Sequence, residues 1–161
     1  MSWLSDGPSR GHAGALYAER ASAQPSRTGA ALRLRLERDA RAPSLARAAV
    51  RAFSGESDIA APDVDTLALL VSELVSNAVL HSDAPPASTI LVRARMLEHG
   101  TVRVEVIDAG SGFDAVRRDA VRSTGGYGLF LVDEQASRWG LDREGGTRAW
   151  FELETSFTGS A

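Results

Sequence analysis

Two runs of β-branched residues joined by a very short turn restrict the fold of this chain more than any other feature. The runs cover residues 89–96 and 101–108, with Glu98-His99-Gly100 in the turn between them. Strands joined so directly pair antiparallel, whereas a parallel pair needs a crossover connection of a dozen or more residues. The pattern therefore predicts a β-hairpin, and it favours a sheet whose neighbouring strands are not linked by helices.

Further strands and helices are expected on both sides of this hairpin. Strict alternation of Leu and Arg at 32–36 predicts a strand with one buried face, and two closing strands are expected at 139–141 and 148–153, turned at Gly145-Gly146. Helical patterns follow Pro43 and Pro62, and a third helix is expected at 127–136. The order β-α-α-β-β-loop-α-β-β predicts an α+β fold, a two-layer sandwich with helices on one face of a mixed, mostly antiparallel sheet.

The two proline-initiated helices each carry an apolar stripe that indicates a buried face. The first helix ends at Gly55, and the residues expected to be buried recur at helical spacing: Leu45, Ala48, Ala49, Ala52 and Phe53. The second helix is stopped by Asp83-Ala84-Pro85-Pro86, and its broad apolar face consists of Leu67, Leu70, Val71, Leu74, Val75, Ala78 and Val79.

Composition limits the class of protein and its partners. The chain has 161 residues, 18 basic and 21 acidic side chains and a formal charge of −3, so a single domain with neither nucleic acid nor a membrane as its main partner is expected. The absence of cysteine excludes disulfides and thiolate metal sites. We find neither a signal peptide nor an apolar run of bilayer length, so a cytoplasmic location is expected. Residues 1–30 are predicted to be a disordered tail, 31–155 the folded domain and 156–161 a short C-terminal tail.

A first group of polar side chains lies on the second helix. Glu73, Asn77 and His81 are spaced four residues apart, along one edge of the apolar stripe. An amide oxygen suits Mg²⁺, which keeps most of its waters, and a nearby carboxylate could orient or deprotonate a nucleophile. The same spacing also fits a solvated helix edge with a hydrogen bond between neighbouring turns.

A second group follows the strand at 101–108 and runs from Asp108 through Gly110, Ser111 and Gly112 to Phe113. Glycines let the backbone pass close to a flat ligand, and an acidic side chain at a strand end can accept a hydrogen bond from an exocyclic amine such as that of adenine. A glycine-rich hairpin turn is the alternative. A dinucleotide-binding fingerprint is disfavoured, because no strand–helix–strand unit of about 30 residues follows it.

A third group is the glycine turn that leads into the third helix. Thr124, Gly125 and Gly126 precede Tyr127, Gly128 and Leu129, and unpaired N–H groups at a helix start bind phosphate well. Arg117, Arg118 and Arg122 precede this turn and extend positive charge over it. A simple helix entry with solvated arginines is the alternative.

Taken in order, these groups resemble the three ATP-binding boxes of the GHKL superfamily. The stretches ELVSNAVLHS, VIDAGSGF, GGYGLFLV and GGTRAWFEL carry the resemblance, which covers roughly residues 31 to 154 and is strongest to free-standing anti-sigma-factor serine/threonine kinases of the RsbW type. The resemblance implies a Bergerat-type ATP-binding fold with ATP and Mg²⁺ as its cofactors.

The resemblance also implies a role for each residue of the three groups. Asn77 would ligate Mg²⁺, and Glu73 would be the candidate catalytic base. Asp108 would accept a hydrogen bond from the adenine amino group. The Thr147 hydroxyl would contact the adenine base through a water molecule. Residues 114–124 would form a lid. The remaining contacts to nucleotide would come from Gly110, Gly112, Phe113, Thr124, Gly125, Gly126, Tyr127, Gly128 and Leu129.

The partners implied by the resemblance are a STAS-domain anti-anti-sigma protein, a sigma factor and a second copy of the chain. The activity implied is Mg²⁺-ATP-dependent phosphorylation of the STAS-domain partner. The sequence departs from the resemblance at Gln135 and Ser137, where a leucine and an acidic residue are expected. The departure near Gln135 favours an alternative, an ATP-gated binding module that sequesters a partner without transfer. The catalytic domain of a split histidine kinase is a further alternative.

Overall fold

A computed structural model of the chain describes residues 30–111 and 127–158. The elements in chain order are β1 (Ala31–Glu37), α1 (Ala42–Glu56), α2 (Ala61–His81), β2 (Thr89–Met96), the 3₁₀ turn η2 (Glu98–Gly100), β3 (Thr101–Asp108), α4 (Tyr127–Gln135), β4 (Arg138–Asp142) and β5 (Thr147–Glu154). Every predicted strand and helix in this part of the chain is present. The expected N-terminal tail and the 114–124 lid lie outside the described residues, apart from residue 30.

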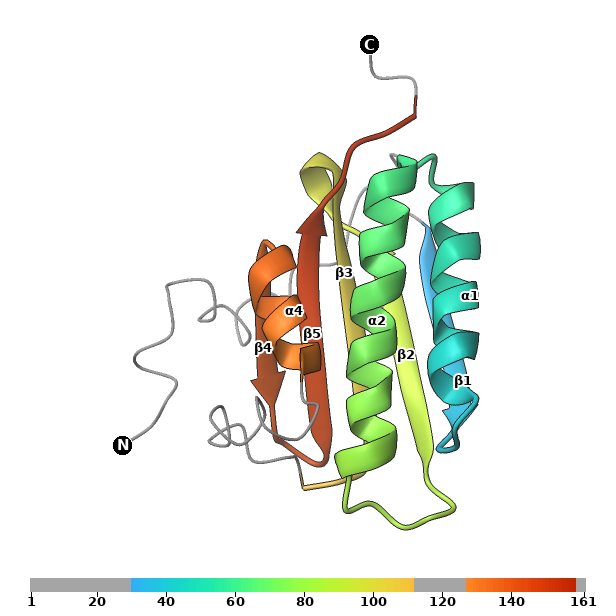
Figure 1. Cartoon of the computed structure of the whole chain (residues 1–161), viewed down its shortest axis with the longest axis vertical. Helices are drawn as coiled ribbons and strands as arrows, with labels where there is room; N and C mark the ends of the chain where they lie inside the picture. Colours follow the sequence, from blue (N-terminus) through green and yellow to red (C-terminus); the bar gives the residue numbers. More distant parts are fainter. Residues whose placement is uncertain (1–29, 112–126, 159–161) are drawn as a thin grey trace, which may run out of the picture.

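The strands form one five-stranded sheet in the order β1-β2-β3-β5-β4. All four neighbouring pairs are antiparallel, so the described part of the sheet is more uniform than the mixed sheet expected from the sequence. The helices α1, α2 and α4 lie together over one face of this sheet, and α1 occupies the edge of the helical layer above β1 (Figure 1). The α+β two-layer prediction is confirmed.

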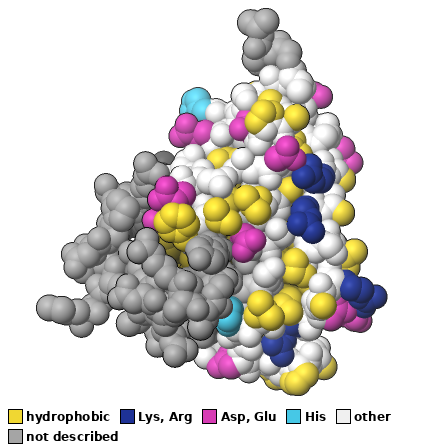
Figure 2. Space-filling view, in the orientation of Figure 1, with side chains coloured by type: hydrophobic (Ala, Val, Ile, Leu, Met, Phe, Trp, Pro, Cys, Tyr) yellow, Lys and Arg dark blue, Asp and Glu magenta, His cyan; other side chains and the backbone are white. Residues whose placement is uncertain are grey.

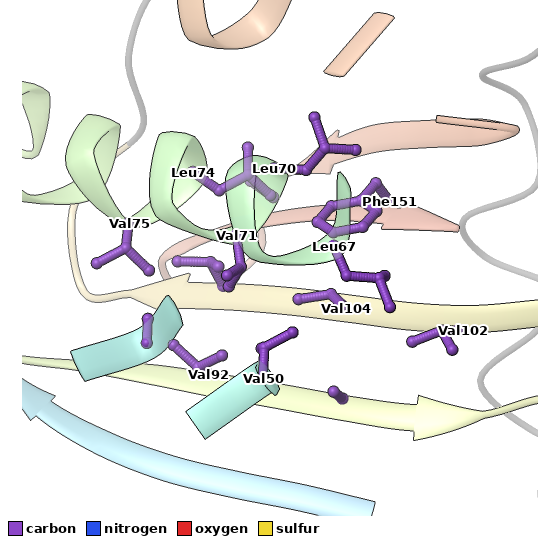
Figure 3. Packing of buried hydrophobic residues seen from close by; sticks show 14 of the residues in the cluster. Val50, Leu67, Leu70, Val71, Leu74, Val75, Val92, Val102, Val104 and Phe151 are labelled. Atoms are coloured by element: carbon purple, nitrogen blue, oxygen red, sulfur yellow. The ribbon is translucent and has the colours of Figure 1, made fainter. Parts of the chain in front are cut away.

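Helix α2 supplies the centre of the core between the helical layer and the sheet. Six of the seven residues predicted for its apolar face are buried, and Val79 is half-buried. They pack against valines of β2 and β3 and against Phe151 of β5 (Figure 3). Burial of each such side chain contributes about 1.5–3 kcal/mol, so α2 holds the two layers together.

The predicted apolar face of α1 is correct at Phe53 and wrong in its direction otherwise. The helix buries Ala42, Ala46, Val50 and Phe53, whereas Leu45 is 51% exposed. The alanines of this helix form more than one apolar stripe at helical spacing, so the sequence alone does not fix which stripe is buried. The stripe that contains both Val50 and Phe53 faces the core, because these larger side chains bury more apolar area than alanines do. Leu45 and two of the predicted alanines are left on the surface as a result.

Length and composition alone would allow α2 to cross a membrane. The helix has 21 residues, and an 18-residue window within it has a mean hydropathy of 1.3. The expectation that no segment is long and apolar enough to span a bilayer is therefore wrong for α2. In this structure 44% of that window is buried, and the buried apolar side chains of α2 belong to the core between the helices and the sheet. The outer helical face carries hydrophobic, acidic and basic side chains side by side (Figure 2).

Candidate functional site

The end of α2, the end of β3 and the start of β5 meet at one end of the sheet (lower end in Figure 1). Asp108, the last residue of β3, lies opposite Thr147, the first residue of β5. The loop that follows α2 reaches the same place through Ser82 and Asp83. Three segments that are far apart in the sequence therefore surround one carboxylate.

Asp108 is only 6% exposed. Its Oδ1 accepts a hydrogen bond from the Ser82 hydroxyl at 2.6 Å and another from the Gly110 amide at 2.7 Å. Burial of a carboxylate is costly unless hydrogen bonds compensate for the lost water. Within the described residues both of these bonds go to Oδ1, which leaves Oδ2 for a further donor.

Glycine is required at two positions beside this carboxylate. A Cβ on Gly110 would come within 2.7 Å of Asp108 Oδ1, and a Cβ on Gly146 would lie 2.5 Å from the Asp108 carbonyl oxygen. Gly146 also has a φ of 135°, which other residues rarely adopt. The buried Thr147 hydroxyl donates to the Gly110 carbonyl oxygen at 3.0 Å, so the start of β5 holds the turn after β3 in place.

Sequence reasoning missed the residues that support this turn. Asp83 accepts hydrogen bonds from both the hydroxyl and the backbone amide of Ser111. Arg38 donates to the carbonyl oxygens of Ser82 at 3.1 Å and Ala84 at 2.8 Å, which ties the end of α2 to the segment after β1. A serine and an aspartate directly after a helix, facing a glycine turn, were the available signal.

The pKa of Asp83 is lowered by its contacts with Ser111. The side-chain hydrogen bond is the largest cause, and the backbone hydrogen bond is the next, because both stabilise the charged carboxylate. Asp83 is exposed, so these bonds serve mainly to fix the position of the turn.

Glu73 and Asn77 lie one turn apart on α2, and both are half-buried. Neither side chain makes a hydrogen bond or an ion pair with another described residue, so the alternative of a bond between these two turns is not realised here. An unpartnered amide oxygen fits a Mg²⁺ ion that keeps several waters and binds through one protein ligand and the phosphates. Within the described ranges no group of three acidic or histidine residues could form a complete metal cage. His81 is exposed.

Helix α4 packs against α2 and begins at Tyr127, so the backbone of Tyr127 and Gly128 forms its first turn. Leu129 is half-buried against the core. The other residues predicted for phosphate and base contacts lie outside the described residues: Gly112, Phe113, Thr124, Gly125 and Gly126. The structure thus brings Asp108, Gly110 and Thr147 into contact and places Glu73 and Asn77 on the helix that α4 packs against.

Comparisons with known proteins agree with this geometry. A model of the histidine kinase-like ATPase domain family matches residues 36–151. The anti-sigma F factors of Caldanaerobacter subterraneus and Clostridium acetobutylicum are 32% and 29% identical to the chain over 75 residues, which is 47% of this chain and 52% of each relative. The chain therefore spans about half the length of these curated relatives.

A solved structure supports the same relationship. The crystal structure of the RsbU and RsbW domains of Rv1364c from Mycobacterium tuberculosis matches with a TM-score of 0.64 and 26% identity, over 80% of this chain and 33% of that one. The chain belongs to the histidine kinase-like ATPase domain family. Its expected resemblance to RsbW-type domains is confirmed.

Replacing Ser111 tests how the turn is held. Ser111→Ala removes the hydroxyl that donates to Asp83, so the Asp83 pKa should rise toward its ordinary value of 3.8. Because the folded pKa lies below that value, this bond stabilises the fold above the ordinary pKa and is lost as pH falls through the folded pKa. NMR titration of the Asp83 carboxyl measures the shift, and Ser44→Ala, which removes a hydroxyl that donates to the Arg41 carbonyl oxygen just before α1, should leave it unchanged. An unchanged Asp83 pKa in Ser111→Ala would contradict the arrangement.

Proposed function

We propose that the chain binds ATP at the site formed by α2, the turn after β3 and the start of α4. The observation that carries this proposal is the buried Asp108 carboxylate, which has two hydrogen bonds on one oxygen and the other left for a donor. The exocyclic amine of adenine is such a donor. At Gly110 a Cβ would collide with the Ser82 hydroxyl and with the carboxylates of Asp108 and Asp83, so glycine lets these groups close around the turn and hold the Asp108 carboxylate in place.

The remaining contacts follow from the family and from the positions of the residues. Asn77 would hold Mg²⁺, which neutralises developing charge on the phosphates. The N–H groups at the start of α4 would receive the phosphates. Thr147 would reach the base through water. The residues proposed to complete the nucleotide contacts are Gly112, Phe113, Thr124, Gly125, Gly126, Tyr127, Gly128 and Leu129.

The chain would act as a regulatory protein serine/threonine kinase in the cytoplasm. Two relatives are anti-sigma F factors and the matching structure contains an RsbW domain, which supports a switch that phosphorylates a STAS-domain anti-anti-sigma protein and otherwise binds a sigma factor. A second copy of the chain is a further proposed partner.

Glu73 is the proposed base for the transfer step. Its half-buried side chain has no partner among the described residues and lies one turn from Asn77. The serine oxygen of the partner attacks the γ-phosphorus, its proton passes to Glu73, the bond to the β–γ bridging oxygen breaks, and ADP leaves. Most of the rate comes from positioning and from neutralising charge.

Calorimetry with and without Mg²⁺ tests the nucleotide site. The native chain should bind ATP in a magnesium-dependent way, and Asn77→Ala should abolish that dependence because the amide ligand is gone. Asp108→Asn should weaken binding at least about tenfold, since it replaces an acceptor that carries a full charge. Thr66→Ala, at the other end of α2, should bind as the native chain does. A folded native chain that fails to bind ATP would overturn the proposal.

Replacing the base separates transfer from binding. Glu73→Gln should bind Mg²⁺-ATP normally but lose phosphoryl transfer to a STAS-domain substrate by about 10²–10⁴-fold, the usual contribution of a general base. The measurement is transfer of labelled phosphate from ATP, with Thr66→Ala, at the other end of α2, as a control that retains activity. ATP binding without transfer by the native chain would favour the ATP-gated binding module.

A further inference from the structure

The face of the sheet that carries no described helix is rich in arginine. A groove of about 410 Å³ extends from β1 across β2 and β3 to β5 on this face, and its charged lining comes from Arg33, Arg93, Arg95, Arg103, Arg148 and a single acid, Glu105. These arginines occupy the strand positions that alternate with the core residues of the helical side, so the groove lies on the opposite face of the sheet from α1 and α2.

Two cross-strand pairs in this groove bring like charges together. Arg33 of β1 lies directly opposite Arg93 of β2, and Arg95 of β2 lies directly opposite Arg103 of β3. Like charges at directly opposed positions destabilise a sheet. Such an arrangement lowers the stability of the sheet, and it indicates a surface that can bind an anionic group from another molecule.

Only part of this positive charge is neutralised by the described residues. Arg103 is 4% exposed, stacks 4.0 Å from the ring centroid of Trp150, and pairs with Glu152 at 2.8 Å and Glu105 at 3.0 Å. Arg93 reaches Glu105 only at 4.0 Å. Arg33, Arg35, Arg95 and Arg148 form no ion pair within the described ranges. Of these guanidinium groups, those of Arg33 and Arg35 lie on β1 and that of Arg95 lies on the neighbouring β2, so donors without acceptors border β1.

The outer edge of β1 is also open in the described structure. β1 is the first strand of the sheet and pairs with β2 alone. Its helix-side residues Leu32 and Leu34 are only half-buried, and its backbone has N–H and C=O groups that face away from β2. Such an edge can accept a further strand.

An apolar surface lies above this edge. Arg51 of α1 pairs with Asp65 of α2 at 2.8 Å, which shows which side of α1 faces α2. At about 100° per residue, Leu45 and Ala52 lie on the flank of α1 that faces away from α2. Helix α1 is at the edge of the helical layer above β1 (Figure 1), so this flank is on the side of the free β1 edge. Leu45 is 51% exposed. The flank of α1 and the leucines of β1 together form an apolar shelf.

We propose that β1 is a docking edge for an extended protein segment in which acidic and apolar residues alternate. The segment adds as a sixth strand, with backbone hydrogen bonds to β1. Its acidic side chains lie on the groove side against Arg33 and Arg35, and its apolar side chains lie on the shelf below Leu45. Guanidinium groups bind carboxylates with paired, directional hydrogen bonds, which favours this chemistry.

Other occupants fit the charges less well. A second copy pairing antiparallel through its own β1, centred on Leu34 so that most of the strand is paired, would place Arg33 of one chain against Arg35 of the other, which is a repulsive contact. Residues 1–29 of this chain contain three arginines but only two acids, Asp6 and Glu19. Nucleic acid would leave the β1 backbone groups unpaired, and the net charge of −3 opposes its approach.

The test uses the full chain and a labelled synthetic peptide of about eight residues in which Glu and Val alternate, matched in length to a strand beside β1. Fluorescence anisotropy at low ionic strength should detect binding that weakens as salt is added. A peptide with Gln in place of Glu should bind at least about tenfold more weakly. Failure of the acidic peptide to bind, or equal binding of both peptides, would overturn the proposal.

Charge reversal on β1 separates docking from folding. Arg33→Glu places an acid opposite Arg93, so the melting temperature should stay the same or rise. The double variant Arg33→Glu/Arg35→Glu should lose the acidic peptide and gain binding of a Lys-Val peptide. Arg47→Glu, on the exposed surface of α1, should change the binding of neither peptide. Retained binding of the acidic peptide by the double variant, or tighter binding of an oligothymidine strand than of the peptide by the native chain, would show that the docking model is wrong.

ATP binding serves as the independent readout. The groove lies on the opposite face of the sheet from α2, so the β1 variants should bind ATP as the native chain does. A loss of ATP binding in these variants would show that the β1 substitutions act by disturbing the whole fold, and it would count against a separate docking edge.

Discussion

The hydrogen bonds around the Asp108 carboxylate hold the candidate site together. They join the residue after α2, the turn after β3 and, through Thr147, the start of β5. A charged hydrogen bond contributes about 1.5–3 kcal/mol, and an unsatisfied buried carboxylate would cost more than that. The position of the turn is thus coupled to the packing of α2, which is itself fixed by the core.

The two faces of the sheet have separate chemistry. The helical side is filled by aliphatic residues of α1, α2 and the strands, and the candidate nucleotide site lies at its end where α2 stops. The other face is built from arginines and a buried ion-pair network that includes Arg103 and Glu152. A protein that must bind a nucleotide and a protein partner can use these faces without competition between the two ligands.

Much of the fold could be predicted because its signals are local. Alternation marked β1, and the short turn after residue 96 marked the hairpin, so strand order in the chain followed directly. The buried face of α1 could not be predicted correctly, because its alanines form more than one stripe at helical spacing and tertiary packing selects among them. The arginine groove was also missed, because the register that places Arg33 opposite Arg93 appears only when β1 pairs with β2.

The candidate site was predicted in part for a similar reason. Asp108, Gly110 and Thr147 were chosen from motifs, and the structure brings them into contact. Ser82, Asp83 and Arg38 were missed because they lie 26 to 46 residues from the groups they contact, and a serine and an aspartate directly after a helix were the only local signal for two of them. The glycine turn before α4 lies outside the described residues, so its role stays a prediction.

The most direct test of the account is the relative affinity of the native chain for ATP and inosine triphosphate. Inosine has a carbonyl oxygen in place of the adenine amino group, so it cannot donate to Asp108 and would place two acceptors together. Sites built around a hydrogen bond discriminate strongly against a ligand that lacks it. Binding of ATP at least about tenfold more tightly than of inosine triphosphate is the predicted result. Equal affinity for the two nucleotides would contradict the assignment of Asp108 as the base acceptor.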